Sequence, residues 1–214
     1  MSGGLVIAVD GPAASGKGTV AARLGQAYGL PVLDTGLLYR AVGVAASRAG
    51  ADPDDPQAAA AVAASIDLMA LDDPAFRTRE AGELASRVAV HPGVRAALNA
   101  AQVGFARRPG GAVLDGRDIG TVIAPWAPAK LFVTARPEVR AERRWRQLTD
   151  QGEAVRLQDV LEDIRRRDAR DGGRADAPLA RAADAVLLDT SEMTIDLAAD
   201  AARRIVEAAR ADRT

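Results

Sequence analysis

Residues 5–19 constrain the fold of this chain more than any other stretch. Residues 5–9 form a short apolar run rich in β-branched side chains, which is typical of a strand buried on both faces of a sheet. A glycine-rich loop follows at residues 11–19, and a helix is predicted to begin near Lys17 and to end around Gly29. A buried strand, a glycine-rich turn and a helix in this order predict the start of an α/β domain.

The chemistry of this loop favours phosphate binding over a purely structural turn. Gly11 and Gly16 let the backbone point several N–H groups at phosphate oxygens, and the helix N-terminus adds its positive end. Lys17 is one of only two lysines, in a chain whose other strong bases are arginines. We expect Lys17 to contact the β- and γ-phosphates of a nucleotide and Thr19 to help hold Mg²⁺. The predicted nucleotide-binding residues of the loop are Gly11, Ala13, Ala14, Ser15, Gly16, Lys17, Gly18 and Thr19.

Several other classes of protein are excluded by the sequence. The loop departs from the strict P-loop pattern because Gly18 separates the lysine from the hydroxyl residue, and Lys130 lies in a context that cannot read guanine, which argues against a GTPase. With 28 basic and 29 acidic residues the net charge is −1, unlike that of a general nucleic-acid binder. The absence of cysteine excludes disulfides, thiolate zinc sites and a cysteine nucleophile. The single histidine, His91, is interpreted as a surface or capping residue rather than a catalyst.

No feature of the sequence indicates a membrane or secretory protein. No basic segment precedes a long apolar run, as a signal peptide would require, and no segment approaches the length of a membrane span. We therefore expect a cytoplasmic protein.

Strand and helix patterns alternate along the rest of the chain. They predict a single domain, residues 1–214, with a parallel sheet covered on both faces and ligands bound beyond the carboxyl ends of its strands. The further predicted strands are residues 31–34, 112–114, 131–134 and 185–188. The further predicted helices are residues 36–49, 58–66, 80–90, 94–107, 137–152, 158–171 and 195–209.

Four further blocks occur in order after the glycine-rich loop. They are Asp-Thr-Gly-Leu-Leu-Tyr-Arg at residues 34–40, the segment 86–95, Asp-Gly-Arg-Asp-Ile-Gly-Thr at residues 115–121, and Arg-Asp at residues 167–168 through Ala-Pro-Leu at residues 177–179. With these blocks the chain resembles the bacterial cytidylate kinases, which are P-loop nucleoside monophosphate kinases. The resemblance implies a P-loop kinase fold with a central parallel five-stranded sheet, helices on both faces, a small monophosphate-binding insert and a helical lid.

The resemblance also implies a division of the single domain. The core would comprise about residues 1–50, 110–150 and 183–214, the insert about residues 51–109, and the lid about residues 153–180. Many members of the family carry a small antiparallel β insert, but the stretch 68–79 is too short for three strands. We expect the insert to be reduced to a turn at residues 71–74. Trp126 replaces part of a proline-acidic pattern, and we assign it only to packing or local surface variation.

The acceptor of the phosphoryl group needs cations of its own. Arg40 and Arg117 follow predicted strand ends, where guanidinium groups can hold a phosphate in bidentate fashion. The resemblance assigns them this role, adds Arg174 as a third contributor, and includes Thr35 among the acceptor-binding residues.

Cytosine presents one amine donor and two acceptors, N3 and O2. A site that selects it requires a carboxylate opposite the amine and donors opposite the acceptors. The resemblance supplies Asp118 for the amine, and Ser86 with Arg95 for N3 and O2. Uracil would place an acceptor against the carboxylate, which a dry pocket discriminates strongly.

The charged segment 165–174 is the predicted lid. Its residues Arg167, Arg170, Asp171 and Arg174 share a helix face as far as Asp171, beyond which two glycines are expected to break the helix. By resemblance, Asp171 with Arg167 would bind the ribose hydroxyls. Lys17, Arg117, Arg170 and Arg174 would stabilise the transferring phosphoryl group. Arg143, with Arg144, would contact the adenine or phosphates of ATP, although an exposed helix face explains these two residues almost as well.

These features together predict an ATP-dependent and Mg²⁺-dependent kinase that converts CMP and dCMP to their diphosphates. Its partners would be small molecules rather than nucleic acid or membrane, and the resemblance suggests a monomer. Three alternatives remain at this point. The first is a kinase of the same fold for another small acceptor, such as another nucleotide or shikimate, and the second is a P-loop binding or regulatory protein with little turnover. The third is an arginine-rich RNA-binding module, against which the charge balance and the aromatic content of 3% both count.

Overall fold

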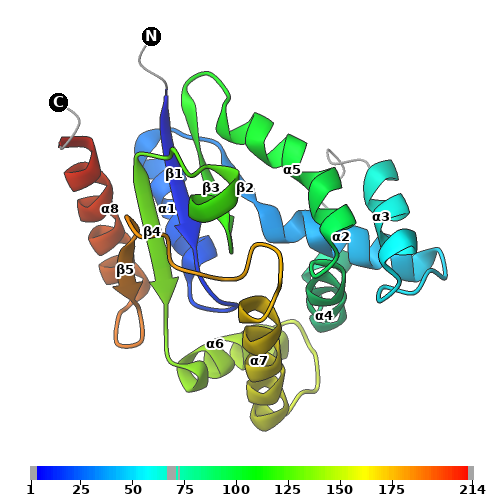
Figure 1. The fold of residues 1–214 in the computed structure, drawn as a ribbon. Helices are drawn as coiled ribbons and strands as arrows, with labels where there is room; N and C mark the ends of the chain where they lie inside the picture. Colours follow the sequence, from blue (N-terminus) through cyan, green and yellow to red (C-terminus); the bar gives the residue numbers. More distant parts are fainter. Residues whose placement is uncertain (1–3, 67–70, 72, 212–214) are drawn as a thin grey trace.

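The computed structural model describes residues 4–66, 71 and 73–211. Five strands form one sheet in the order β2-β3-β1-β4-β5, and every neighbouring pair is parallel (Figure 1). The strands are β1 (Leu5–Asp10), β2 (Val32–Asp34), β3 (Gly111–Gly116), β4 (Ala129–Thr134) and β5 (Val186–Asp189). The predicted five-stranded parallel sheet is therefore confirmed.

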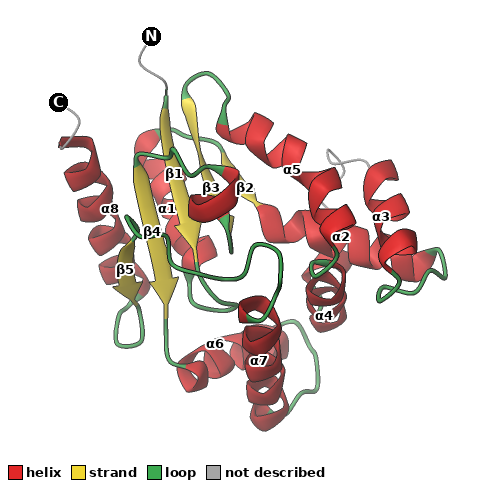
Figure 2. Ribbon diagram, in the orientation of Figure 1, coloured by secondary structure: helices red, strands yellow, loops and turns green. Residues whose placement is uncertain are grey.

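Eight α-helices surround the sheet in the described part of the chain (Figure 2). They are α1 (Lys17–Tyr28), α2 (Thr35–Arg48), α3 (Pro56–Ser65), α4 (Arg79–Val88), α5 (Pro92–Ala106), α6 (Pro137–Asp150), α7 (Leu157–Gly172) and α8 (Ile195–Ala211). Each corresponds to a predicted helix with ends shifted by a few residues. Two short elements were not predicted: a 3₁₀ helix (Pro74–Arg77) and a π-helical turn (Ile119–Ile123), which we call the π turn.

The alternation of side chains along β1 separates two hydrophobic layers, because successive residues of a strand point to opposite faces. Ile7 and Val9 pack with α1 and α8 on one face of the sheet. Val6 and Ala8 pack on the other face with the C-terminal end of α5 and with the π turn. Helices therefore cover both faces of the central strand, as the apolar run predicted.

Helices α2, α3, α4 and α5 form a third apolar cluster beside the sheet, which includes Leu38, Val88 and Leu98. The predicted turn at residues 71–74, which would replace a β insert, lies partly outside the described residues. Within the described residues this region contains the 3₁₀ helix, whose first turn is capped by Asp73 through a 2.8 Å hydrogen bond from the backbone N–H of Ala75.

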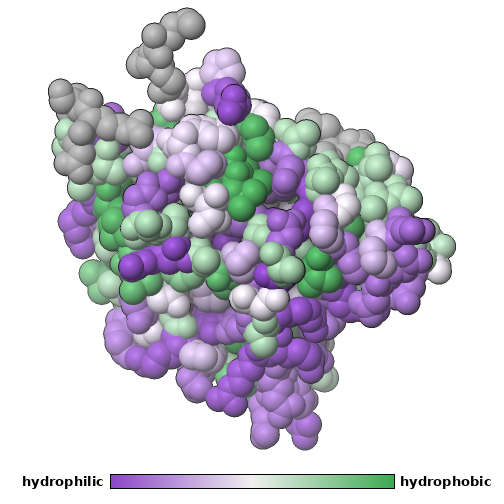
Figure 3. Space-filling model, in the orientation of Figure 1, coloured by the Kyte–Doolittle hydropathy of each residue, from purple (hydrophilic) through white to green (hydrophobic). Residues whose placement is uncertain are grey.

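Helices α6 and α7 lie below the carboxyl ends of the strands in the view of Figure 1. They pack together through Leu148, Val160 and Ile164. Their outer surface is strongly hydrophilic, in the lower part of Figure 3. The strand register places Asp34 opposite Asp115, and Asp10 opposite Gly116, so polar side chains from three adjacent strands meet at the sheet edge that faces these helices.

The side chain of His91 does not have the surface or capping role expected from the sequence. His91 stands at the N-cap position of α5, but its side chain makes no capping hydrogen bond and is buried. Its Nε2 lies 2.9 Å from the carbonyl oxygen of Pro53, so it ties α5 to the loop before α3.

Trp126 is 40% exposed and contacts the guanidinium of Arg107, 4.6 Å from the ring centre, which agrees with local surface variation.

Asp10, the last residue of β1, fixes the π turn. Its two carboxylate oxygens accept hydrogen bonds from the backbone N–H groups of Ile119, at 2.8 Å, and Gly120, at 2.7 Å. The side chain is buried, and burial is the largest cause that raises its pKa to about 7. Since π turns are rare and cost regular backbone pairing, such a specific anchor explains how this one is held.

We predict that Asp10→Asn lowers the free energy of unfolding by about 1–3 kcal/mol at pH 5, because the hydroxyl oxygen of the protonated carboxyl can still accept an N–H, whereas the amide nitrogen cannot. The folded-state pKa of Asp10 lies above its unfolded value, so the stability that its proton contributes is lost as pH rises through about 7. The deficit of the variant should therefore narrow between pH 5 and pH 8 in urea unfolding.

The matched control is Asp200→Asn, which changes an exposed carboxylate of α8. A deficit that is absent at pH 5, or that widens with pH, would contradict the role given to Asp10.

Candidate functional site

The loop between β1 and α1 has the backbone that phosphate binding requires. Gly11 has a φ of +153°, and a Cβ atom there would lie 2.0 Å from the carbonyl oxygen of Val133, so only glycine fits. Gly16, in the left-handed region, is the N-cap residue of α1, and it has no side chain that could cap the helix. The first N–H groups of the helix therefore remain available to an anion.

Lys17 projects from the first turn of α1 into a buried ion pair. Its Nζ lies 3.3 Å from Oδ1 of Asp115, and the two side chains are 13% and 4% exposed. Burial and the nearby Arg117 lower the pKa of Lys17, whereas Asp115 opposes that change. A Cβ atom on Gly18 would lie 3.1 Å from Oδ2 of Asp115, which explains the glycine between the lysine and Thr19.

A cavity of about 410 Å³ opens beside Lys17. Thr19, Asp34 and Asp115 line one end of it. Hydroxyl and carboxylate oxygens are suitable ligands for Mg²⁺, and Oδ1 of Asp115 accepts no hydrogen bond among the described residues besides its 3.3 Å ion pair with Lys17. No group of three His, Cys, Asp or Glu side chains within the described ranges could hold a metal ion. The chain therefore fits a Mg²⁺ ion whose remaining ligands come from phosphates and water.

The other end of this cavity is formed by Arg143 and by residues 190–195. Arg143 donates from Nη1 to Oγ1 of Thr190, at 2.9 Å, and from Nη2 to the Thr190 carbonyl, at 2.7 Å. Thr190 in turn donates to the carbonyl of Ser15 in the loop, at 2.9 Å. Arg143 is thus anchored at the cavity and not spread over a helix face. Met193, Thr194 and Ile195 add to the wall and were not predicted, because no motif marks them.

Every predicted acceptor residue except Arg40 lines one small cavity, of about 40 Å³, which we call the base cavity. These residues are Thr35, Ser86, Arg95, Arg117, Asp118, Arg167, Asp171 and Arg174. They come from α2, α4, α5, the segment after β3, α7 and the loop after α7. The fold therefore gathers residues that lie up to about 140 positions apart in the chain, as their motifs predicted.

Three polar side chains in the base cavity form a directional set. Arg95, 2% exposed, donates through a short hydrogen bond from Nη2 to Oδ2 of Asp118. Its Nη1 and the Oγ of Ser86 are buried without hydrogen-bond partners among the described residues. The ring of Tyr39, which was not predicted as a site residue, lies 5.9 Å from the Arg95 guanidinium and adds an aromatic wall. Unpaired buried donors of this kind cost stability unless a ligand satisfies them.

Arg40 lines an adjoining cavity of about 230 Å³ together with Arg144, Arg167 and the loop residues Ala13 and Ala14. Burial and neighbouring guanidinium groups lower the pKa of Arg40 to about 10 and that of Arg167 to about 9. These groups repel one another. A bound anion would reduce that repulsion, so the arginines between the two cavities suit an anionic ligand.

Other predicted residues are already paired within the protein. Arg117 donates from Nε to Asp171, at 2.9 Å, and Thr35 donates its hydroxyl to the carbonyl of Asp115, at 2.8 Å. Arg174 lies beyond the end of α7, since the helix stops at Gly172 as the two glycines predicted, and its Nε reaches the Asp171 carbonyl, at 3.3 Å.

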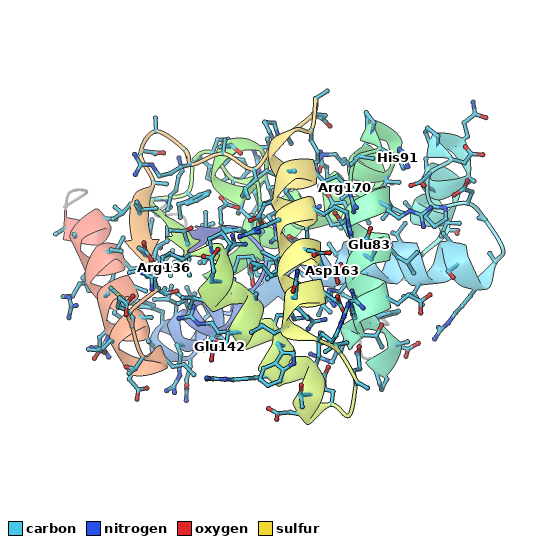
Figure 4. All side chains as sticks on the ribbon, turned by 90° about the horizontal axis from the view of Figure 1, so that it is seen from below. Glu83, His91, Arg136, Glu142, Asp163 and Arg170 are labelled. Carbon is cyan, nitrogen blue, oxygen red and sulfur yellow. The ribbon has the colours of Figure 1, made fainter. Side chains whose placement is uncertain are left out.

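Arg170 lines neither of these cavities. Its Nη2 donates to Oε1 of Glu83 on α4, at 2.8 Å, and Figure 4 shows the two residues on neighbouring helices. A second bridge between the same regions joins Nε of Arg79 to Asp163, at 2.6 Å. These pairs hold α7 against α4, and no motif in the sequence marks Glu83 or Arg79, their partners on α4.

Asp168 carries out a structural task that its motif did not reveal. Both of its oxygens accept from the buried Arg140, at 2.9 and 2.6 Å, while Arg140 also donates to the carbonyls of Ala135 and Ala13. A single guanidinium thus joins α7 to the phosphate-binding loop.

The fold and the site define a P-loop phosphotransferase architecture, with a donor cavity beside Lys17 and a separate, arginine-rich acceptor cavity. A family model described as cytidylate kinase matches residues 7–209. A cytidylate kinase of Caulobacter vibrioides (strain NA1000 / CB15N) is 72% identical over 208 residues, which cover 97% of this chain and 98% of that protein. A cytidylate kinase of Xanthobacter autotrophicus is 61% identical, over 98% of this chain and all of that one. This chain belongs to the cytidylate kinase family.

A crystal structure of a protein from Eubacterium ventriosum supports the fold alone. It is similar with a TM-score of 0.56 and 15% identity, and covers 95% of this chain and 98% of its own. Among the helices of residues 4–66 and 73–211, none has both the length and the apolar character needed to cross a bilayer.

We predict that Arg167→Met leaves the ligand-free protein at least as stable as the wild type, because it removes a guanidinium repelled by Arg40 and Arg117. The same change should weaken binding of a nucleoside monophosphate such as CMP at least tenfold, which is roughly the effect of losing one charge-assisted hydrogen bond. Urea unfolding with and without CMP measures both effects.

Arg165→Met is the control, since Arg165 is an exposed residue of α7 paired with Glu138. If the Arg167 variant loses stability without ligand and keeps its CMP affinity, Arg167 is structural and does not serve the anion.

Proposed function

We propose that this protein is an ATP-dependent nucleoside monophosphate kinase that transfers a phosphoryl group to CMP and dCMP. The observation that carries the proposal is the base cavity, in which Ser86, Arg95 and Asp118 meet beside buried arginines. Membership of the cytidylate kinase family supports the same reaction. We further propose that the enzyme acts as a cytoplasmic monomer on small-molecule nucleotides.

On the donor side, the loop N–H groups and Lys17 bind the phosphates of ATP. The nucleoside of ATP occupies the end of the larger cavity near Arg143 and residues 190–195. Thr19, with Asp34 and Asp115, supplies oxygen atoms for Mg²⁺. When bound, Mg²⁺ neutralises part of the charge on the phosphates. Lys17 then exchanges part of its interaction with Asp115 for the β- and γ-phosphates.

On the acceptor side, Arg40, Arg117 and Arg174 hold the phosphate of CMP. No strong general base is required, because the attacking phosphate oxygen is already anionic. Catalysis therefore depends on positioning and on charge stabilisation by Lys17 and the arginines. Arg170 would contribute to charge stabilisation at the transferring phosphoryl group only after its ion pair with Glu83 breaks. Its role therefore depends on movement of α7.

The base is recognised by protein groups that accept a hydrogen bond from its amine and donate hydrogen bonds to its N3 and O2. Asp118 accepts from the exocyclic amine of cytosine, while Ser86 and Nη1 of Arg95 donate to N3 and O2. The Arg95–Asp118 pair orients both partners before the base arrives. Asp171, with Arg167, binds the ribose hydroxyls, and tolerance of dCMP requires that the 2′-hydroxyl is not essential.

We propose that the chain moves as a core, an insert at about residues 51–109 and a lid at about residues 153–180. Contacts from Arg79 and Arg170 join the lid helix to α4, so the insert and the lid close together. Closure excludes water from the phosphates and limits hydrolysis of ATP.

The test is the formation of ADP from ATP and Mg²⁺ with each nucleoside monophosphate in turn. CMP and dCMP should be converted far more efficiently than UMP, AMP or GMP. Lys17→Ala should remove turnover by at least a thousandfold while circular dichroism shows a retained fold, because the main cation at the transferred phosphates is lost. Activity with no monophosphate, or near-normal turnover of a folded Lys17→Ala protein, would refute the proposal.

Asp118→Asn should lower kcat/KM for CMP by one to two orders of magnitude and relatively favour UMP, because the amide places a donor where cytosine also donates. Steady-state kinetics with both acceptors gives the ratio. An unchanged CMP to UMP ratio would show that Asp118 does not read the base.

A further inference from the structure

The segment between α7 and β5, residues 173–185, crosses the acceptor side of the molecule, and we call it the strap. One of its side chains, Asp176, contacts Arg95, which lines the base cavity. Its Oδ2 lies 3.3 Å from Nε of Arg95. Arg95 is thus paired with two carboxylates, Asp118 from the segment after β3 and Asp176 from the strap.

The two pairs use different nitrogens of one guanidinium. Nη2 donates to Asp118, Nε faces Asp176, and Nη1 is buried without a partner among the described residues. A guanidinium is planar and rigid, so fixing Nε and Nη2 also fixes the direction of Nη1. The remaining donor is the one that the proposed function assigns to the base.

The strap is held in a conformation that its sequence alone would not favour. Ala177, directly after Asp176, has a φ of +46° and is buried. A left-handed conformation is unfavourable for a residue other than glycine, so the surroundings must maintain it. The N–H of Leu179 donates to the carbonyl of Asp171 at 2.8 Å, which ties the strap back to α7.

We propose that Asp176 is a positioning residue for base recognition: it holds Nε of Arg95 from the strap and so directs Nη1 into the base cavity. Because the strap continues from the lid helix, Arg95 is fully oriented only when the lid is closed. Base reading and lid closure are thereby coupled, which is a form of induced-fit discrimination. This inference rests on the proposed function and adds a residue to it.

An ordinary surface ion pair does not account for this contact. Asp176 is 54% exposed, and pairs between two exposed side chains contribute little. Here the partner is almost fully buried and remains paired with Asp118 when Asp176 is removed. Loss of Asp176 should therefore appear in substrate binding and specificity more than in stability.

Asp176→Ala tests the proposal. We expect kcat/KM for CMP to fall about tenfold, mainly through a higher KM for CMP, with the KM for ATP unchanged. The ratio of kcat/KM for CMP to that for UMP should fall as well. Asp176→Glu, which keeps the charge, should restore part of the lost kcat/KM for CMP. Asp176→Asn should have a kcat/KM between those of the Ala and Glu variants.

Glu162→Ala is the matched control, because it removes an exposed carboxylate of the lid helix away from the base cavity. This variant should leave kcat, the KM values for CMP and ATP, and the CMP to UMP ratio unchanged. Calorimetric titration of CMP without ATP gives a second measure, in which Asp176→Ala should bind more weakly. If Asp176→Ala does not fold, the Asn and Glu variants decide the question.

The outcomes separate the two hypotheses. A wild type that does not prefer CMP refutes the proposed function itself. A wild type that prefers CMP, with variants of unchanged KM and CMP to UMP ratio, overturns the role of Asp176 alone. An equal loss with CMP and UMP, seen in kcat, would also overturn it, since that result indicates a general effect on the lid.

Discussion

The constraint on which this structure depends is the confinement of several positive charges beneath one helix. Arg40, Arg117 and Arg167 lie close enough to affect one another, and burial adds to the cost of each charge. The protein offsets part of that cost with carboxylates that lead back to the scaffold: Asp115 for Lys17 and Asp171 for Arg117. The charge that remains uncompensated marks the place where we propose that the acceptor phosphate binds. Relief of this repulsion would contribute to the affinity for an anion, so part of that affinity has the same origin as the cost of the empty site.

The fold was largely predictable because it follows from local patterns. The apolar run of β1, the glycine-rich loop and the alternation of strands and helices lead directly to the parallel sheet. The acceptor residues were identified through motifs, and every one except Arg40 lines the base cavity. The roles of the site residues remain proposals, because geometry shows that they meet and not what they bind.

What could not be predicted depends on partners far away in the chain. The π turn has no local signature, since its stability comes from the carboxylate of Asp10, more than a hundred positions earlier. Arg170 was expected on the lid face with Arg167 and Asp171, but it lines neither cavity and instead bonds to Glu83 on α4, a neighbour that helix spacing alone does not indicate. His91 is buried and contacts the carbonyl oxygen of Pro53, a contact that secondary-structure propensities do not predict. In each case tertiary proximity selects the partner after the elements have formed.

The anchoring of the π turn by Asp10 has a consequence for the evolution of specificity. Asp10 immediately precedes the phosphate-binding loop, and the turn that it holds immediately follows Asp118. The glycine-rich loop and Asp118, the carboxylate proposed to read the base, are thus tied together through Asp10. Under the proposed function, a change of base preference that reshapes this turn would also disturb the loop proposed to bind the phosphates of ATP. Helix α5 is tied to the same group through the Arg95–Asp118 pair, whereas the side chain of Ser86 on α4 has no hydrogen-bond partner among the described residues, so replacements on α4 offer the freer route to a new acceptor.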